Sequence, residues 1–255
     1  MPDIQQLSRT KAEQFLKRYY APNNAVIAVV GAIKPTEVIR LVERYFGDIP
    51  PGTPVPELTI REEPQRGERR VEVVGDAQPE LVIGFHKPAI GHDDDYVFDL
   101  ITALLGQGRT SRLYRSLVLE KQLATQVSVF DAPGQRHPNL LVLYATPRAP
   151  HTAAEVEQAL LAELERLKNE PVTPRELQRV MNRLELEEAR RMGTNGGLAR
   201  NLTEYEATAG SWRYLSTYTT RMARITPADI QRVARQFLTR TNRIVGTLVT
   251  QQAGG

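Results

Sequence analysis

The chain has 255 residues, of which 41% are hydrophobic and 25% are charged, the composition of an ordinary globular protein. Lysine and arginine outnumber aspartate and glutamate by only 33 to 30 and are spread along the chain, so the charge does not indicate a nucleic-acid partner. The absence of cysteine excludes disulfides, thiolate metal sites and a cysteine nucleophile.

The first 50 residues are predicted to form a helix, a short strand and a second helix. Residues 25–30 are an apolar run that ends at Gly31, the pattern of a buried strand. Pro35 opens the second helix at its first turn, and Gly47 stops it. Because this segment is too short to bury a core of its own, residues 1–50 are predicted to be the C-terminal remnant of a preceding domain.

A change of composition follows this segment. Five prolines and two glycines fall between residues 48 and 68, among glutamates and arginines. Such a sequence is typical of a semi-extended connection. Residues 51–68 are therefore predicted to be a linker, and residues 69–255 a complete second domain.

The second domain is predicted to begin with a region that contains four strands, continue with a block of helices, and end with a last strand. The predicted strands are residues 69–74, 81–86, 125–131, 140–146 and 244–249. The predicted helices are residues 93–105, 111–121, 153–168, 174–191, 198–209, 212–222 and 228–238. This order predicts an α+β fold class, in which the helices pack on one face of a mixed or antiparallel sheet.

The four histidines have a spacing that does not suit a helical metal site. His86, His92, His137 and His151 are 6, 45 and 14 residues apart, whereas two ligands on one helix face are about four residues apart. A site made of His92 and one of the three aspartates that follow it is the alternative. We favour the simpler interpretation, in which the aspartates stabilise a helix start and the histidines are solvated.

Several other motifs have simple structural interpretations. Gly106 and Gly108 lack the third glycine of a dinucleotide fingerprint and follow a helix, so a helix end is predicted there. Ser111 lacks the flanking glycines of a nucleophile elbow. Residues 192–197 are predicted to break two helices, in preference to forming a substrate-contacting loop. The glutamates and arginines of residues 185–191 are predicted to pair at the surface.

Aromatic residues gather near the C-terminal helices. The group comprises Tyr205, Trp212, Tyr214 and Tyr218. Half-buried packing within the helical block is the favoured interpretation, and an aromatic wall of a peptide-binding site is the alternative.

Three stretches together resemble the pitrilysin–insulysin family of zinc peptidases, inverted zincins that include the mitochondrial processing peptidases. The first is YYAPNNA at residues 19–25, with the apolar run to Gly31 and YFGDIP at residues 45–50. The second is LLGQGRTSRLY at residues 104–114, and the third is ITPADI at residues 225–230. The first two are specific, and the third is less so.

The resemblance implies two similar α+β domains that face each other across a peptide-holding chamber. Zinc sits only in the first half, bound by a His-x-x-Glu-His motif and a downstream glutamate. The glutamate within the motif polarises the attacking water, and the metal polarises the scissile carbonyl. We expect these residues to precede this chain in the parent protein. The chain itself is therefore expected to hold no catalytic residue, metal ligand or cofactor, with zinc in the parent.

The resemblance also bears on a partner subunit. In family subunits without zinc, the helix after Gly-x-Gly often carries an arginine and, seven positions later, a tyrosine. The corresponding positions here are Val118 and Thr125, which cannot donate as arginine and tyrosine do. This second domain therefore resembles that of a zinc-bearing subunit, whose arginine–tyrosine pair would come from a homologous partner chain.

The expected function is that of the C-terminal half of a zinc metalloendopeptidase, which forms the non-metal wall of the chamber and is inactive alone. Its expected partners are a peptide or unfolded polypeptide substrate, the N-terminal domain and a homologous subunit. The substrate-binding residues are not predicted. The alternative is a non-catalytic scaffold subunit of the kind found in respiratory complexes, and a third hypothesis is a free-standing peptide-binding module.

Compartment is left open by the sequence. No apolar run approaches the roughly 20 residues of a membrane span, so no span is expected. Residues 1–17 lack the apolar core of a signal peptide and are predicted to be helical. The cytoplasm and the bacterial periplasm are both compatible with these features.

Overall fold

A five-stranded mixed sheet organises the larger part of the chain. The computed structural model describes residue 4, residues 6–58 and residues 62–250. The strands are β1 (Arg69–Gly75), β2 (Glu80–Lys87), β3 (Ala124–Ala132), β4 (Asn139–Pro147) and β5 (Arg243–Thr250). They lie in the order β1–β5–β2–β4–β3. Only β1 and β5 run parallel, and the other neighbours are antiparallel, which confirms the predicted α+β fold class.

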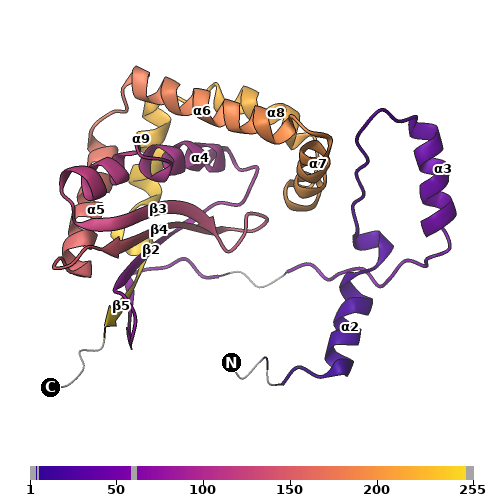
Figure 1. Ribbon diagram of the computed structural model, residues 1–255, viewed down its shortest axis with the longest axis horizontal. Coiled ribbons are helices and arrows are strands. Elements are labelled where there is room, and N and C mark those ends of the chain that lie inside the picture. The colour runs from indigo at the N-terminus through magenta and orange to yellow at the C-terminus, as the bar shows by residue number, and fades with distance from the viewer. Residues whose placement is uncertain (1–3, 5, 59–61, 251–255) are drawn as a thin grey trace.

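Helices cover one face of this sheet in two layers (Figure 1). The inner helices are α4 (Asp93–Gly106), α5 (Ala153–Asn169) and α9 (Pro227–Phe237), and each contacts strands of the sheet. The outer helices are α6 (Pro174–Met192), α7 (Asn195–Ala209) and α8 (Tyr214–Met222). α6 and α8 pack on α4, and α7 packs on both of them. The opposite face of the sheet carries no helix of this layer.

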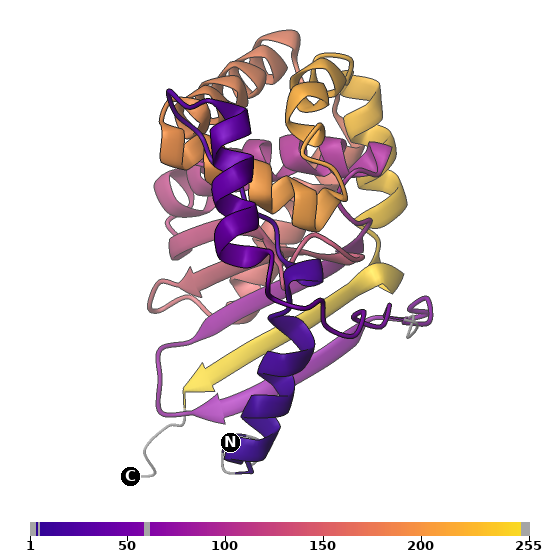
Figure 2. The same cartoon turned by 90° about the vertical axis from the view of Figure 1, so that its right-hand side faces the viewer.

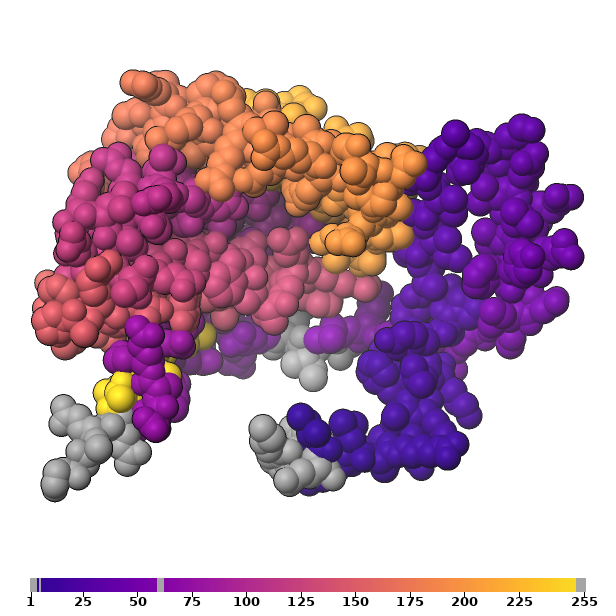
Figure 3. Space-filling model, viewed as in Figure 1, coloured from indigo at the N-terminus to yellow at the C-terminus, as the bar shows by residue number. Residues whose placement is uncertain are grey.

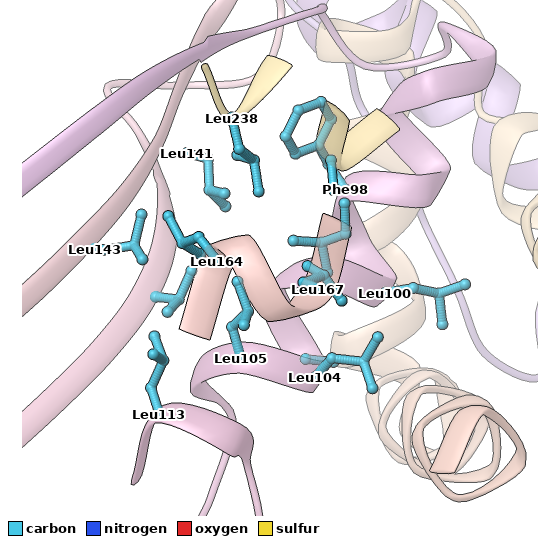
Figure 4. Close-up of a cluster of buried hydrophobic side chains, with 14 of the residues drawn as sticks. Phe98, Leu100, Leu104, Leu105, Leu113, Leu141, Leu143, Leu164, Leu167 and Leu238 are labelled. Atoms are coloured by element: carbon cyan, nitrogen blue, oxygen red, sulfur yellow. The ribbon is translucent and has the colours of Figure 1, made fainter. Parts of the chain in front are cut away.

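The hydrophobic core lies between the sheet and the inner helices. Alternate residues of β2 and β4 point toward the helices and are fully buried, as the pleat requires; they are Leu81, Ile83, Phe85, Leu141 and Leu143. Figure 4 shows leucines of β4, α4 and α5 meeting in this layer, together with Phe98. Each such side chain contributes about 1.5–3 kcal/mol by leaving water.

Capping residues fix where most of these helices begin. Thr152 and Thr226 each form a capping box, with Glu155 and Asp229 respectively. His92 caps α4, because its Nδ1 atom accepts a hydrogen bond from the Asp94 amide at 3.1 Å. The aspartates do lie in the first turn of α4, but the cap itself comes from the histidine.

The helix predicted at residues 111–121 is irregular. Tyr114–Glu120 is a π-helix, in which the Lys121 amide donates to the Ser116 carbonyl at 2.9 Å. The buried Ser116 hydroxyl donates to Glu163 of α5 at 2.8 Å. Wide turns of this kind are often found at functional elements of proteins, and this one connects α4 to β3.

The N-terminal residues lie beside the layered unit (Figures 1 and 3). They form α2 (Arg9–Tyr19), a 3-10 turn (Pro22–Asn24) and α3 (Pro35–Phe46), and neither helix has a buried residue. Residues 25–30 pair with no strand in the part of the chain that the structure describes, so the prediction of a strand there was wrong. The apolar side chains of this segment are largely exposed; they include Phe15, Val26, Ile27, Val29, Ile39 and Tyr45.

Candidate functional site

The helix-free face of the sheet carries several exposed apolar side chains. Paired residues on adjacent strands point to the same side of a sheet. One row across it is Val71, Gly246, Val82, Tyr144 and Ser128. We call the side of the sheet that carries this row the open sheet face. Figure 2 shows the strands below the helix layers in that view.

The centre of the open sheet face is not covered. A Cβ atom added to Gly246 would meet no other atom within 4 Å. Apolar side chains around it are exposed: Val71 by 57%, Val73 by 54%, Val82 by 38% and Phe130 by 44%. Exposed apolar patches on folded proteins mark interaction surfaces. The face therefore has the character of a binding surface for an apolar or extended partner.

Polar contacts mark two borders of the open sheet face. On one side, the Tyr144 hydroxyl donates to Glu80 at 2.7 Å. On the other, Gln65 donates to the Arg243 carbonyl at 2.7 Å, and its side-chain oxygen lies 3.3 Å from His86 Nε2. The linker thus contacts the sheet at the start of β5, and His86 is half-buried by it instead of being solvated as predicted.

A buried ion cluster lies on the helix side of the sheet. Lys87 Nζ is 2.8 Å from Asp95 Oδ1 and 2.6 Å from Asp131 Oδ2, and the lysine side chain is fully buried. Burial alone would lower the pKa of Lys87, but the two carboxylates outweigh it and the pKa is raised. This cluster was not predicted from the sequence. The available signal was Lys87 itself, which continues the inward alternation of Leu81, Ile83 and Phe85.

A cavity of about 490 Å³ lies between α4 and the outer helices. Asp99 and Thr102 of α4 line it, together with tyrosines of α7 and α8. The predicted aromatic group is mostly packed here: Tyr205 and Tyr214 are buried and their ring centroids are 4.9 Å apart. Trp212 is the exception, because it is 44% exposed.

The surface pairing predicted for the glutamates and arginines of residues 185–191 is confirmed only in part. Glu187 lies 2.8 Å from Arg183, and Glu188 pairs with Arg191. Glu188 is only 2% exposed, so this pair is not a surface pair. The break at residues 192–197 is confirmed, because α6 ends at Met192 and Thr194 caps α7.

The histidines do not converge in the structure. His92 caps α4, His86 contacts Gln65, and His151 Nδ1 lies 3.6 Å from Glu155. Across residues 4, 6–58 and 62–250, no three histidines, aspartates or glutamates are grouped as metal ligands. The buried carboxylates of Asp95 and Asp131 both pair with Lys87. These residues do not fit a zinc ion.

The two positions that correspond to the family's arginine and tyrosine differ in their exposure to solvent. Val118 is buried in the π-helix, with 8% exposure. Thr125 is exposed on β3, where its hydroxyl donates to the Thr146 carbonyl at 3.3 Å. A buried valine packs in the core, so neither residue offers a charged donor to a substrate.

Comparisons with known proteins place these features in a family. The chain is 26% identical over 242 residues to the zinc protease PqqE of Helicobacter pylori, covering 93% of this chain and 54% of that protein. The chain therefore spans about half the length of this relative. In the described part of the chain, no helix is long and apolar enough to cross a membrane.

Solved structures share the fold. The crystal structure of a protease from Helicobacter pylori matches with a TM-score of 0.92 at 24% identity, over 98% of this chain and 61% of that one. The peptidase M16 inactive domain from Pseudomonas fluorescens matches with a TM-score of 0.80 at 19% identity, over 98% and 59% of the two chains. Residues 6–184 match the family described as the peptidase M16 inactive domain. The chain belongs to this family, which confirms its resemblance to the zinc peptidases.

Proposed function

We propose that this chain forms the non-metal wall of a peptide-binding chamber in a zinc metalloendopeptidase. The open sheet face is the observation that carries the proposal. Its exposed valines and Phe130 offer apolar contacts to side chains of any sequence. A flat, apolar floor of this kind suits an unfolded polypeptide, which has no fixed shape to match.

Residues 1–50 are proposed to belong to a preceding, zinc-bearing type of domain, with residues 51–68 as the linker to the second domain. The support is that α2 and α3 bury no residue and leave their apolar side chains exposed. Residues 25–30 likewise form no strand ladder with any other described residue. A neighbouring domain would cover these side chains and pair this backbone.

In this proposal the zinc chemistry is supplied by the other half of the chamber. We expect the chain alone to contain substoichiometric zinc and to leave an unfolded, fluorescently labelled polypeptide uncleaved. Metal analysis by mass spectrometry and a cleavage assay with and without chelator would measure both. Stoichiometric, tightly bound zinc together with chelator-sensitive cleavage by the chain alone would contradict the proposal.

Contact with peptide can be tested at Gly246. The Gly246→Glu variant places a charged side chain on the uncovered centre of the open sheet face, where the added Cβ atom would meet no other atom within 4 Å. We expect it to lower photo-cross-linking of an unfolded apolar peptide by about tenfold, because the charge would have to be desolvated beneath the bound chain.

The matched control is Gly196→Glu, which also meets no atom within 4 Å but lies in α7, on the helix side. It should cross-link like the wild-type protein, and both variants should keep the wild-type unfolding temperature within a few degrees. Equal cross-linking of all three proteins, or labelling confined to the helices, would remove the support for a peptide-binding wall. That outcome would favour the scaffold hypothesis.

A further inference from the structure

The cavity between α4 and the outer helices has an enclosed carboxylate at its wall. Asp99 projects from the middle of α4, and the Tyr218 hydroxyl donates to its Oδ2 atom at 2.9 Å. Among residues 4, 6–58 and 62–250, no donor reaches its Oδ1 atom. Asp99 is nevertheless only half-buried, because the cavity borders it. A carboxylate placed in this way presents a free acceptor to the cavity.

Two more polar atoms in residues that line the cavity lack partners. The Thr102 hydroxyl and the Gln107 Oε1 atom are buried, and neither has a hydrogen-bond partner in the described part of the chain. Both residues line the cavity. Buried polar atoms are normally satisfied in native proteins. A ligand that brings hydrogen-bond donors to this end of the cavity would supply what is missing.

Tyrosine rings of α7 and α8 line the same cavity. The ring centroids of Tyr205 and Tyr214 are 4.9 Å apart, and those of Tyr214 and Tyr218 are 5.8 Å apart. Burial raises the pKa of all three phenols, that of Tyr205 to about 12, so the rings are neutral. Electron-rich ring faces next to a carboxylate favour an organic cation through cation–π attraction.

Charges at the mouth of the cavity largely cancel. Arg191 is held by Glu188, and Glu187 is held by Arg183. Arg190 and Glu204 are exposed at the rim and have opposite charges. An anion that entered would meet Asp99 and Asp95 at the inner end. The residues at the inner end of the cavity, rather than those at its rim, therefore determine whether a cation or an anion is preferred.

We propose that this cavity binds an alkylammonium or guanidinium group, anchored by Asp99 and flanked by Thr102 and the tyrosine rings. Its volume lies in the range of small-molecule sites. The group is carried either by a free amine or by a lysine or arginine side chain of a peptide. The cavity lies on the helix side of the sheet, so this site is independent of the open sheet face and of the proposed chamber.

Agmatine is the probe for a free amine, because it carries an alkylammonium group and a guanidinium group. An unstructured peptide with one arginine is the probe for the second source, and its arginine-to-alanine version is the reference. Calorimetric titration of the chain at pH 8 should give saturable binding of at least one probe. The Asp99→Asn variant should bind about tenfold more weakly or not at all, because the charge-assisted hydrogen bond is lost.

Asp93→Asn is the matched control, since it makes the same change on the same helix at a side chain that is 83% exposed and outside the cavity. It should bind like the wild-type chain, and thermal unfolding would show that both variants are folded. Binding of agmatine identifies a free amine as sufficient, and binding of the arginine peptide alone identifies a peptide side chain. Equal affinities of the wild-type chain and Asp99→Asn, or no binding of either probe at millimolar concentration, would overturn the proposal.

The pH dependence of binding gives a separate readout. Charged and titratable groups face Asp99 from several elements: Asp95 on α4, Lys87 on β2, Asp131 on β3, Tyr205 on α7, and Tyr214 and Tyr218 on α8. Burial, followed by the charge of Asp95, raises the pKa of Asp99 to about 7. Because a cation prefers the ionised carboxylate, its affinity should fall as pH decreases from 8 to 5.5. An unchanged affinity over this interval would exclude Asp99 as the anchoring group.

Discussion

Replacing Lys87 with alanine is expected to lower the free energy of unfolding by about 3–5 kcal/mol. The lysine is the shared partner of Asp95 and Asp131, whose side chains are 5% and 11% exposed. Without it, two carboxylates remain close together in a region that excludes water. Leaving a buried charge unpaired costs more than the intact pair contributes. Urea unfolding of the two proteins at neutral pH would measure the difference.

Two further variants separate charge from packing at this position. Lys87→Met keeps an unbranched side chain near Phe98, whose ring centroid is 5.4 Å from the lysine Nζ atom. It should nevertheless be destabilised nearly as much as the alanine variant. Lys121→Ala, at an exposed position, should change stability by less than about 0.5 kcal/mol. A loss below about 1 kcal/mol for both Lys87 variants would show that the carboxylates are well solvated in the folded protein.

The Asp99→Asn variant is expected to be more stable than the wild-type chain at pH 8, by about 2–4 kcal/mol. The folded protein raises the pKa of Asp99 from 3.8 to about 7, chiefly through burial. Between these values the unfolded chain ionises Asp99 while the folded chain keeps it protonated. The wild-type protein therefore loses stability as pH rises from about 4 to 7, and asparagine removes this loss.

The stabilisation by Asp99→Asn should disappear near pH 3, where the carboxyl is largely protonated in both states. Parallel urea titrations of the variant and the wild-type chain at several pH values would show this convergence. Asp93→Asn serves as the reference, because the Asp93 side chain is exposed. This substitution changes the net charge of the protein by the same amount as Asp99→Asn. A constant difference between Asp99→Asn and the wild-type chain at all pH values would show that the effect does not come from ionisation.

Helices were predictable because local signals mark their ends. Thr152, Thr173 and Thr226 cap α5, α6 and α9, and proline occupies an early position in the last two. The helix predicted at residues 93–105 is observed as Asp93–Gly106. The final strand predicted at residues 244–249 is observed as Arg243–Thr250. Capping and turn chemistry depend on neighbours in sequence, so a single chain reveals them.

Strand pairing and the polar sites were less accessible from the sequence. Residues 25–30 have a strand-like pattern, but a strand also needs a partner backbone, which a local pattern does not provide. Asp99 was not singled out from the sequence, because its partner Tyr218 is 119 residues away. The role of Lys87 likewise depends on Asp131, which is 44 residues away. Long-range contacts of this kind are set by topology.

The position of β5 in the sheet constrains the order in which the protein folds. β5 lies between β1 and β2, and it is the partner strand of β1 in the described sheet. Arg69 pairs with Ile244, so closing this ladder joins residues separated by most of the layered unit. Such distant contacts are slow to form. During synthesis, β1 cannot form its ladder until β5 has been made. The first strand in the chain is therefore among the last to join the sheet.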